Sequence, residues 1–180
     1  MKKLITHFVI ILFAGGLTSL LAQENGILSQ IVAVSKEDRV KFKTVKTIAV
    51  LLNSNDALLS RFVEDALNIH LTNIGFAVVN REKLEKSVGE ELVKKRTEKV
   101  EGAINALEIV RKVNADAILT GTVFIVSDDQ QSLFVKMASF QIVEVESEKT
   151  LISILFEFEK GKTFSDITKG FVDILRQNLE

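Results

Sequence analysis

The chain has no cysteine, proline, tryptophan or tyrosine, and phenylalanine supplies all twelve of its aromatic residues. Without cysteine it can form no disulfide, thiolate nucleophile, cysteine metal site or lipid-modified cysteine. Without tryptophan and tyrosine it lacks the rings on which sugar-binding grooves usually stack a glycan. The formal net charge is −1, so the sequence also lacks the basic surface typical of nucleic-acid-binding proteins. These absences disfavour thiol chemistry, glycan recognition and nucleic-acid binding.

The N-terminal residues have the pattern of an export signal. Two lysines precede the apolar run Leu4–Ala14, and small residues follow it up to Ala22. This order of charged, apolar and small residues is typical of a secretory signal peptide, so we predict a signal over 1–22. The alternative is a retained membrane anchor, since Leu4–Leu21 is close to the shortest apolar stretch that spans a bilayer. The mature protein is expected to be periplasmic and not lipidated.

Residues 23–46 are predicted to be a lead-in segment before the domain. The stretch ILSQIVAV within it is compatible with one turn of helix or with an edge strand. Residues 36–46 alternate charge with Val40, Phe42 and Val45, which we interpret as a partly extended connection to the first core strand. The lysines of this connection favour a solvated strand edge over a patch for phosphate or anionic lipid.

A strand–helix–strand unit over 47–81 forms the centre of the sequence. TIAVLLN is a continuous apolar run, as expected of a strand buried on both faces, and SND supplies capping side chains for a helix. Gly75 stands where a left-handed residue commonly ends a helix, and FAVVNR follows as a second strand. A unit joined this tightly predicts two parallel strands with a right-handed crossover. The helix is expected to bury one stripe, formed by Leu59, Phe62, Val63, Ala66, Leu67, His70 and Ile74.

The rest of the chain predicts two middle helices, an antiparallel meander and a last helix. Asn80 can cap the first middle helix at Arg81, and Thr163 can cap the last helix. The meander is expected to begin with the strand Asp116–Val126, in which Gly121 marks a bulge or a close backbone approach. The predicted fold class is therefore α/β: one domain with a single mixed sheet in two or three layers, opened by a βαβ unit.

No constellation of side chains predicts a catalytic, cofactor-binding or metal site. The sequence contains no phosphate-binding glycine loop, no HExxH and no GxSxG, the motifs that would indicate such chemistry. His70 is interpreted as a core or boundary residue, because one histidine without a cysteine partner cannot form a typical zinc site. Asp128 and Asp129 are interpreted as turn residues, with a carboxylate-dependent hydrolase as the alternative. We therefore expect no enzyme, no cofactor and no small-molecule substrate.

Four stretches, over about 47–160, carry a resemblance to a known family. KTIAVLLN is similar to its opening strand, GFAVVNRE to its "vv-[DN]-R" signature, ALEIVRKVNADAILTGTV to its segment ending in "vltGtv", and SFQIVEVESEKTLIS to its strand–turn–strand. In this order they resemble the family of the curli secretion protein CsgG and the penicillin-binding-protein activator LpoB, with the TolB N-terminal domain as a structural relative. The chain departs from the family's hallmark lipoproteins because it has no cysteine to lipidate.

The resemblance implies the domain boundaries, the function and a set of structural residues. The domain is expected to cover 47–180. It would be a non-enzymatic exported module that acts on an envelope protein partner and associates into a homo-oligomer. The alternative is an oligomeric accessory protein of secretion or motility at the outer membrane. Arg81 would be an ion-pairing or capping residue. The signature positions, all expected to be structural, are Asn80, Arg81, Asp116, Thr120 and Gly121.

Overall fold

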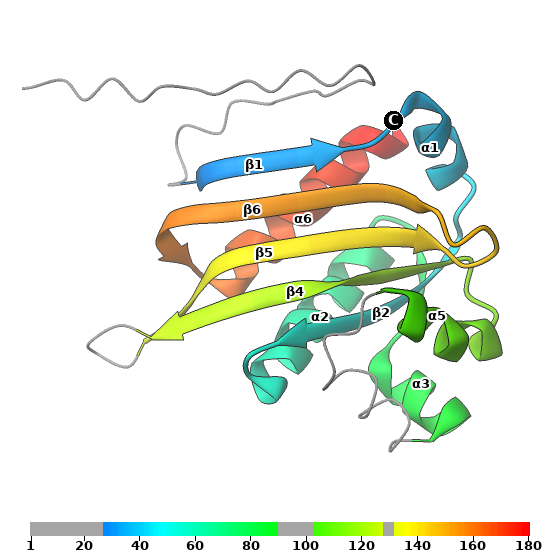
Figure 1. The fold of residues 1–180 in the computed structure, drawn as a ribbon, viewed down its shortest axis with the longest axis horizontal. Coiled ribbons are helices and arrows are strands. Elements are labelled where there is room, and N and C mark those ends of the chain that lie inside the picture. Colours follow the sequence, from blue (N-terminus) through cyan, green and yellow to red (C-terminus); the bar gives the residue numbers. More distant parts are fainter. Residues whose placement is uncertain (1–26, 90–102, 128–131) are drawn as a thin grey trace, which may run out of the picture.

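The computed structural model describes residues 27–89, 103–127 and 132–180, and a six-stranded mixed sheet lies at its centre (Figure 1). The sheet has the order β1-β6-β5-β4-β2-β3, in which β2 is parallel to β3 and β4 and the other pairs are antiparallel. The predicted α/β class, with its βαβ opening unit, meander and last helix, is confirmed. The predicted signal over 1–22 and the turn residues Asp128 and Asp129 lie outside the described residues.

The bounds of the elements follow the chain in order. The strands are β1 (Ile27–Ala33), β2 (Thr47–Ser54), β3 (Ala77–Val79), β4 (Ala117–Ser127), β5 (Leu133–Glu144) and β6 (Thr150–Lys162). The helices are α1 (Lys36–Phe42), α2 (Ala57–Asn73), α3 (Arg81–Val88), α5 (Ala103–Val110), the 3₁₀ turn η1 (Arg111–Val113) and α6 (Phe164–Leu179).

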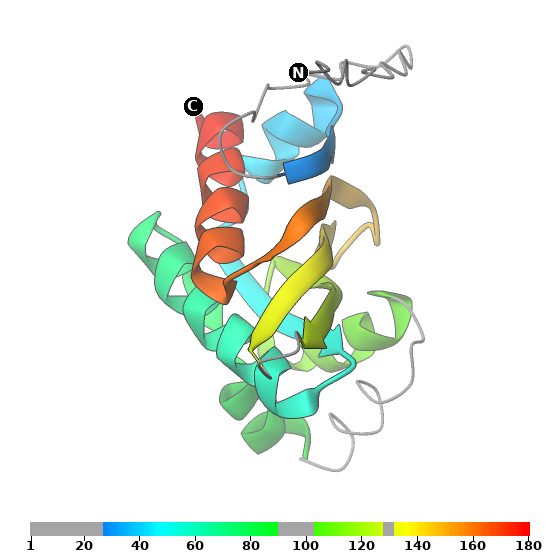
Figure 2. The same ribbon diagram turned by 90° about the vertical axis from the view of Figure 1, so that its left-hand side faces the viewer.

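Helices cover the two faces of the sheet unequally. The larger core lies where α2 and α6 pack together on one face (Figure 2), and a smaller core lies where α3 and α5 cover β2 and β4 on the other. Phe140 of β5 stands 4.7 Å from Phe171 of α6 and 6.3 Å from Phe156 of β6, between ring centroids. These tilted and edge contacts are favoured geometries for aromatic pairs, and they fix α6 against the sheet.

Three of the helices begin at the caps that the sequence predicts. The side chain of Asp56 accepts hydrogen bonds from backbone N–H groups in the first turn of α2, as Asn80 does for α3 and Thr163 for α6. Each such cap contributes about 1 kcal/mol to helix stability. Gly75 ends α2 with a φ of 102°, a backbone conformation that only glycine adopts without strain.

The prediction of a partly extended segment over 36–46 is wrong, because Lys36–Phe42 is the helix α1. Ser35 caps this helix by accepting from the N–H of Asp38 at 3.0 Å, and Phe42 is fully buried in the larger core. The Ser35–Asp38 spacing is a capping signal that the charge alternation obscured. Of the two alternatives for ILSQIVAV, the edge strand is observed: β1 pairs with β6. Residues of the predicted lead-in therefore form part of the same sheet.

The predicted buried stripe of α2 is correct only in part. Val63 and Leu67 are buried as expected, but Phe62 is 57% exposed. The buried face extends toward Ser60, Glu64 and Leu71, and Glu64 has its partner Arg81 in the interior. The apolar pattern alone therefore placed Phe62 on the wrong side of the helix.

Candidate functional site

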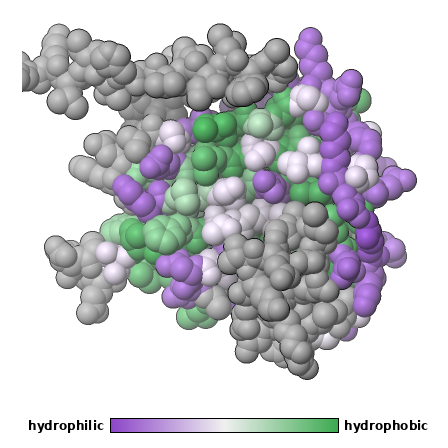
Figure 3. Space-filling view, viewed as in Figure 1, coloured by the Kyte–Doolittle hydropathy of each residue, from purple (hydrophilic) through white to green (hydrophobic). Residues whose placement is uncertain are grey.

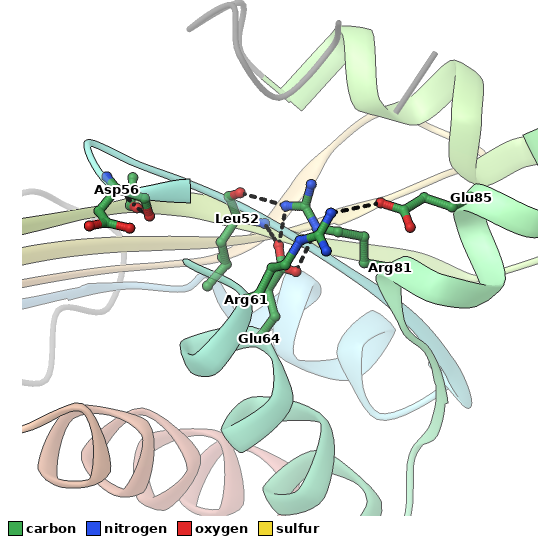
Figure 4. A network of polar contacts seen from close by, with 7 residues as sticks. Leu52, Asp56, Arg61, Glu64, Arg81 and Glu85 are labelled. Atoms are coloured by element: carbon green, nitrogen blue, oxygen red, sulfur yellow. Dashed lines mark hydrogen bonds and ion pairs between the residues drawn. The ribbon is translucent and has the colours of Figure 1, made fainter. Parts of the chain in front are cut away.

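A buried ion pair joins α2 to the start of α3. Arg81 donates from Nε to Oε2 of Glu64 at 2.8 Å and from Nη2 to Oε1 at 2.6 Å. The Glu64 side chain is only 2% exposed and that of Arg81 only 13%. Such a two-point contact between guanidinium and carboxylate is strong and geometrically specific. Figure 4 shows the pair between α2 and the end of β2.

The ion pair also satisfies the backbone of β2. The N–H of Leu52 donates to Oε1 of Glu64 at 2.7 Å, and its carbonyl accepts from Nη2 of Arg81 at 3.1 Å. β3 pairs with β2 only as far as Ala49, whereas β2 continues to Ser54. Buried backbone groups need partners, so the two side chains take the place of the strand residues that β3 lacks.

The other side of the same strand end is completed by an amide side chain. Nδ2 of Asn55 donates to the carbonyl of Ile125 at 2.9 Å, and the N–H of Ile125 donates to Oδ1 of Asn55 at 3.0 Å. This double contact lies where the register of β4 and β5 shifts, between Phe124 and Ile125. Side chains thus continue the hydrogen bonding of β2 toward both of its neighbours.

Burial lowers the pKa of Arg81, but the hydrogen bonds and charge of Glu64, with the charge of Glu85, outweigh it and raise that pKa. Arg81 therefore stays charged, and its guanidinium donates hydrogen bonds to Glu64 and to the carbonyl of Leu52. Glu85 also forms a looser ion pair with Arg61 at 3.5 Å, where the Arg61 side chain is 56% exposed. The arrangement suits a structural clamp and offers no nucleophile or proton donor to a substrate.

The structure does not gather the five signature positions into one site. Arg81 lies at the carboxyl end of β2, next to its helix cap Asn80. Asp116 lies at the opposite end of that strand and accepts from the N–H groups of Lys46 and Thr47 at 2.9 and 2.8 Å.

Thr120 and Gly121 lie on β4, opposite Leu51 and Leu52 of β2. The close backbone approach expected at Gly121 is present, since a Cβ there would stand 1.9 Å from the carbonyl oxygen of Ser139. Glu64 is the residue that sequence reasoning missed. Its signal was the spacing of Ser60, Glu64, Leu67 and Leu71, which places a glutamate on a helix face that is otherwise compatible with burial.

The described part of the chain shows no arrangement for metal chemistry. Within 27–89, 103–127 and 132–180, no group of three or more histidines and acidic residues could hold a metal ion. His70 is half-buried near the end of α2. A search of the same ranges finds no helix with the length and apolar character needed to cross a bilayer.

A cleft of about 580 Å³ opens at the amino end of β2 and β4. Three of its charged lining residues are already engaged. Arg111 pairs with Glu148, Glu144 pairs with Lys41, and Asp116 holds two backbone N–H groups. Glu146 also lines the cleft and is exposed, but a single carboxylate beside engaged neighbours does not define a ligand.

Two apolar surfaces remain exposed outside these polar contacts. The first, the α2 ridge, consists of Leu58, Phe62 and Ile69, which are 64%, 57% and 63% exposed. Spacings of four and seven residues place the three side chains on one face of the helix. This face points away from the sheet, because the opposite face of α2 carries Val63, Leu67 and Leu71 into the larger core.

The second surface, the open sheet face, consists of Ile31, Phe124, Met137 and Leu155. Phe124 lies opposite Met137 across β4 and β5, and Ile31 lies opposite Leu155 across β1 and β6. Their strand neighbours point into the larger core, so these four side chains point to the other face. Ile31, Phe124 and Met137 are 49%, 46% and 42% exposed. Figure 3 shows this side, with apolar atoms over the upper strands and at the left ends of β4 and β5.

Comparisons with known proteins identify the fold but no family. No model of a known protein family matches the chain, and no curated protein sequence matches it. Among solved structures, the PelC dodecamer from Paraburkholderia phytofirmans is similar with a TM-score of 0.51 and 13% identity, over 84% of this chain and 96% of that one. The chain therefore shares its fold with PelC.

Two further solved structures are similar at lower TM-scores. The LpoB C-terminal domain from Escherichia coli has a TM-score of 0.44 and 17% identity, over 64% of this chain and 83% of that one. The lipoprotein GNA1162 from Neisseria meningitidis has a TM-score of 0.42 and 18% identity, over 74% and 97%. The resemblance to the CsgG and LpoB family that the sequence carries stays a prediction.

Proposed function

We propose that the protein is a non-enzymatic, exported binding and assembly module that acts on an envelope protein partner and associates with its own copies. The observation that carries the proposal is the pair of exposed apolar surfaces, the α2 ridge and the open sheet face. Exposed apolar patches of this kind mark protein interaction sites. The charged groups in the interior, by contrast, are committed to structural contacts.

Three further observations support the proposal. The sequence is expected to begin with an export signal over 1–22 and to lack any lipidation site. The four motif stretches resemble the CsgG and LpoB family. The solved PelC structure, which shares the fold, is a dodecamer. Together they favour an envelope location and self-association.

The test is cross-linking capture of the tagged protein from envelope extracts, together with its mass by light scattering. We expect one envelope protein to be recovered reproducibly, and a mass above that of the monomer. Phe62→Lys should reduce recovery, whereas Lys169→Glu, a charge change on an exposed residue of α6, should not. Recovery of no partner, together with a monomeric mass, would overturn the proposal.

A second candidate is an oligomeric accessory protein of secretion or motility at the outer membrane, and the dodecameric PelC structure is the observation that favours it. Light scattering with and without lipid vesicles separates the two. Co-sedimentation with vesicles would favour the accessory protein. An oligomer that does not co-sediment with vesicles would favour the soluble binding module.

A further inference from the structure

We propose that the α2 ridge of one copy docks onto the open sheet face of a second copy, in a head-to-tail contact. The inference rests on the proposed function, since it names the surfaces through which the module associates with itself. Each of the two surfaces is covered by the other surface of a neighbouring copy.

The distribution of exposed apolar side chains carries this inference. In the described ranges, eight large apolar residues are exposed, and six of them lie on these two surfaces. The ridge belongs to the helical layer on one side of the sheet, and the open sheet face lies on the other side (Figures 1 and 2). One copy therefore cannot cover its own sheet face with its own ridge, whereas two copies can.

One surface lies on a helix and the other on a sheet. An apolar helix laid on a sheet is the packing by which α2 and α6 already cover the opposite face. α2 has 17 residues, so it is roughly 25 Å long and about 10 Å wide. A footprint of that size is about 250 Å² on each copy, which is below the roughly 1,200–2,000 Å² buried in total in specific complexes. A single contact should therefore dissociate on dilution.

The charges beside the two surfaces are complementary. Arg61 lies next to Phe62 and exposes 56% of its side chain, and its pairing with Glu85 is loose at 3.5 Å. Glu157 is exposed on β6, directly opposite Met137 of the open sheet face. In the proposed contact Phe62 packs over Met137, which places the opposite charges of Arg61 and Glu157 in the same interface; Glu157 also accepts a hydrogen bond from Ser29 at 3.3 Å.

A contact between two different surfaces has a geometric consequence. Each copy keeps one free ridge and one free sheet face, so copies add head to tail and form a ring when the rotation closes, or a filament when it does not. An isologous dimer would instead bury the same surface on both copies. The two arrangements give opposite results in a mixing experiment.

The experiment mixes two charge variants of the purified protein, Phe62→Lys on the ridge and Met137→Lys on the sheet face. Light scattering at increasing concentration should show assembly of the wild type and monomers for each variant alone. A mixture of the two should give dimers and nothing larger, because only one productive contact remains. Val40→Lys, which changes an exposed apolar residue outside both surfaces, should assemble like the wild type. Circular dichroism confirms that each variant is folded.

Cross-linking gives a second readout, because the chain contains no cysteine. Phe62→Cys mixed with Met137→Cys should form a disulfide-linked dimer, and neither variant should form one alone. A dimer from a single variant, a mixture that stays monomeric, or a wild type that is monomeric throughout would each overturn the interface. A monomeric wild type that still captures an envelope partner would overturn only the interface, whereas loss of both would also overturn the proposed function.

Discussion

Arg81 and Glu64 form a two-point ion pair at the place where β3 has ended and β2 continues. Their bonds to the N–H and carbonyl of Leu52 make the pair part of the sheet's hydrogen bonding. The pair is therefore a salt bridge that also supplies the hydrogen bonds which a longer β3 would make to β2.

Arg81→Ala should lower the free energy of unfolding by about 3–5 kcal/mol, because it leaves the buried carboxylate of Glu64 without its counter-charge. Urea unfolding measures the change. The control is Arg61→Ala, which removes a half-exposed ion pair at 3.5 Å and should cost about 0–1 kcal/mol. An unchanged midpoint for Arg81→Ala with loss of partner binding would instead make Arg81 a binding residue.

Replacing both partners, as Arg81→Met with Glu64→Leu, should not restore stability. A buried ion pair can often be exchanged for apolar residues at little cost. Here the exchange also leaves the N–H and carbonyl of Leu52 without partners, which costs about 1–3 kcal/mol for each buried group. The double variant should therefore unfold at a lower urea concentration than the wild type. A midpoint equal to that of the wild type would show that Leu52 finds other partners.

Gly121→Ala should prevent normal pairing of β4 with β5, because the added Cβ would stand 1.9 Å from the backbone oxygen of Ser139. We expect a loss of about 3 kcal/mol or more, as for severe overpacking, seen as a lower melting temperature or insoluble protein. Gly170→Ala is the matched control. Nothing lies within 4 Å of its added Cβ, and alanine in a helix interior should stabilise by about 0.5–1 kcal/mol.

The contacts between α1 and the β5–β6 turn should make the fold sensitive to acid. Burial raises the pKa of Asp38. Hydrogen bonds from Lys149 and Ser35 lower it by more than burial raises it, so the pKa lies below its ordinary value. Hydrogen bonds from Lys41 and Ser147 lower the pKa of Glu144.

Both carboxyl pKa values lie below those of the unfolded chain, so their stabilisation is present above the ordinary carboxyl range of about 4. It is lost as the pH falls through the lowered values. Asp38→Asn should therefore destabilise the protein at neutral pH and flatten the dependence of unfolding free energy on pH below about 5. Asp173→Asn, on the exposed side of α6, is the control. A pH dependence equal to that of the wild type would show that Asp38 contributes nothing to the acid sensitivity.

The sequence predicted those parts of the fold whose signals are local. The apolar run of β2, the caps Asp56, Asn80 and Thr163, and the positive φ of Gly75 depend on residues within one or two turns of each other. These elements were predictable because local geometry and burial favour the same conformation.

The features that were missed depend on contacts between distant segments. Glu64 could be recognised as buried only once Arg81, 17 positions away, was known to meet it. α2 buries Glu64 and leaves Phe62 exposed, an orientation that a hydrophobic pattern alone does not reveal. The open sheet face could not be predicted either. Alternation of apolar and polar residues shows that a strand has two faces, but not whether a helix covers the second one.

The place of β1 in the sheet also bears on the order in which the molecule can fold. Ser29 of β1 bonds to Glu157 of β6, 128 positions later, so the first strand has no partner until nearly the whole chain has been synthesised. Pairing across such a long separation is slow because the loop must close first. A growing chain therefore keeps its N-terminal strand unpaired, and the sheet closes only after the last hairpin has been made.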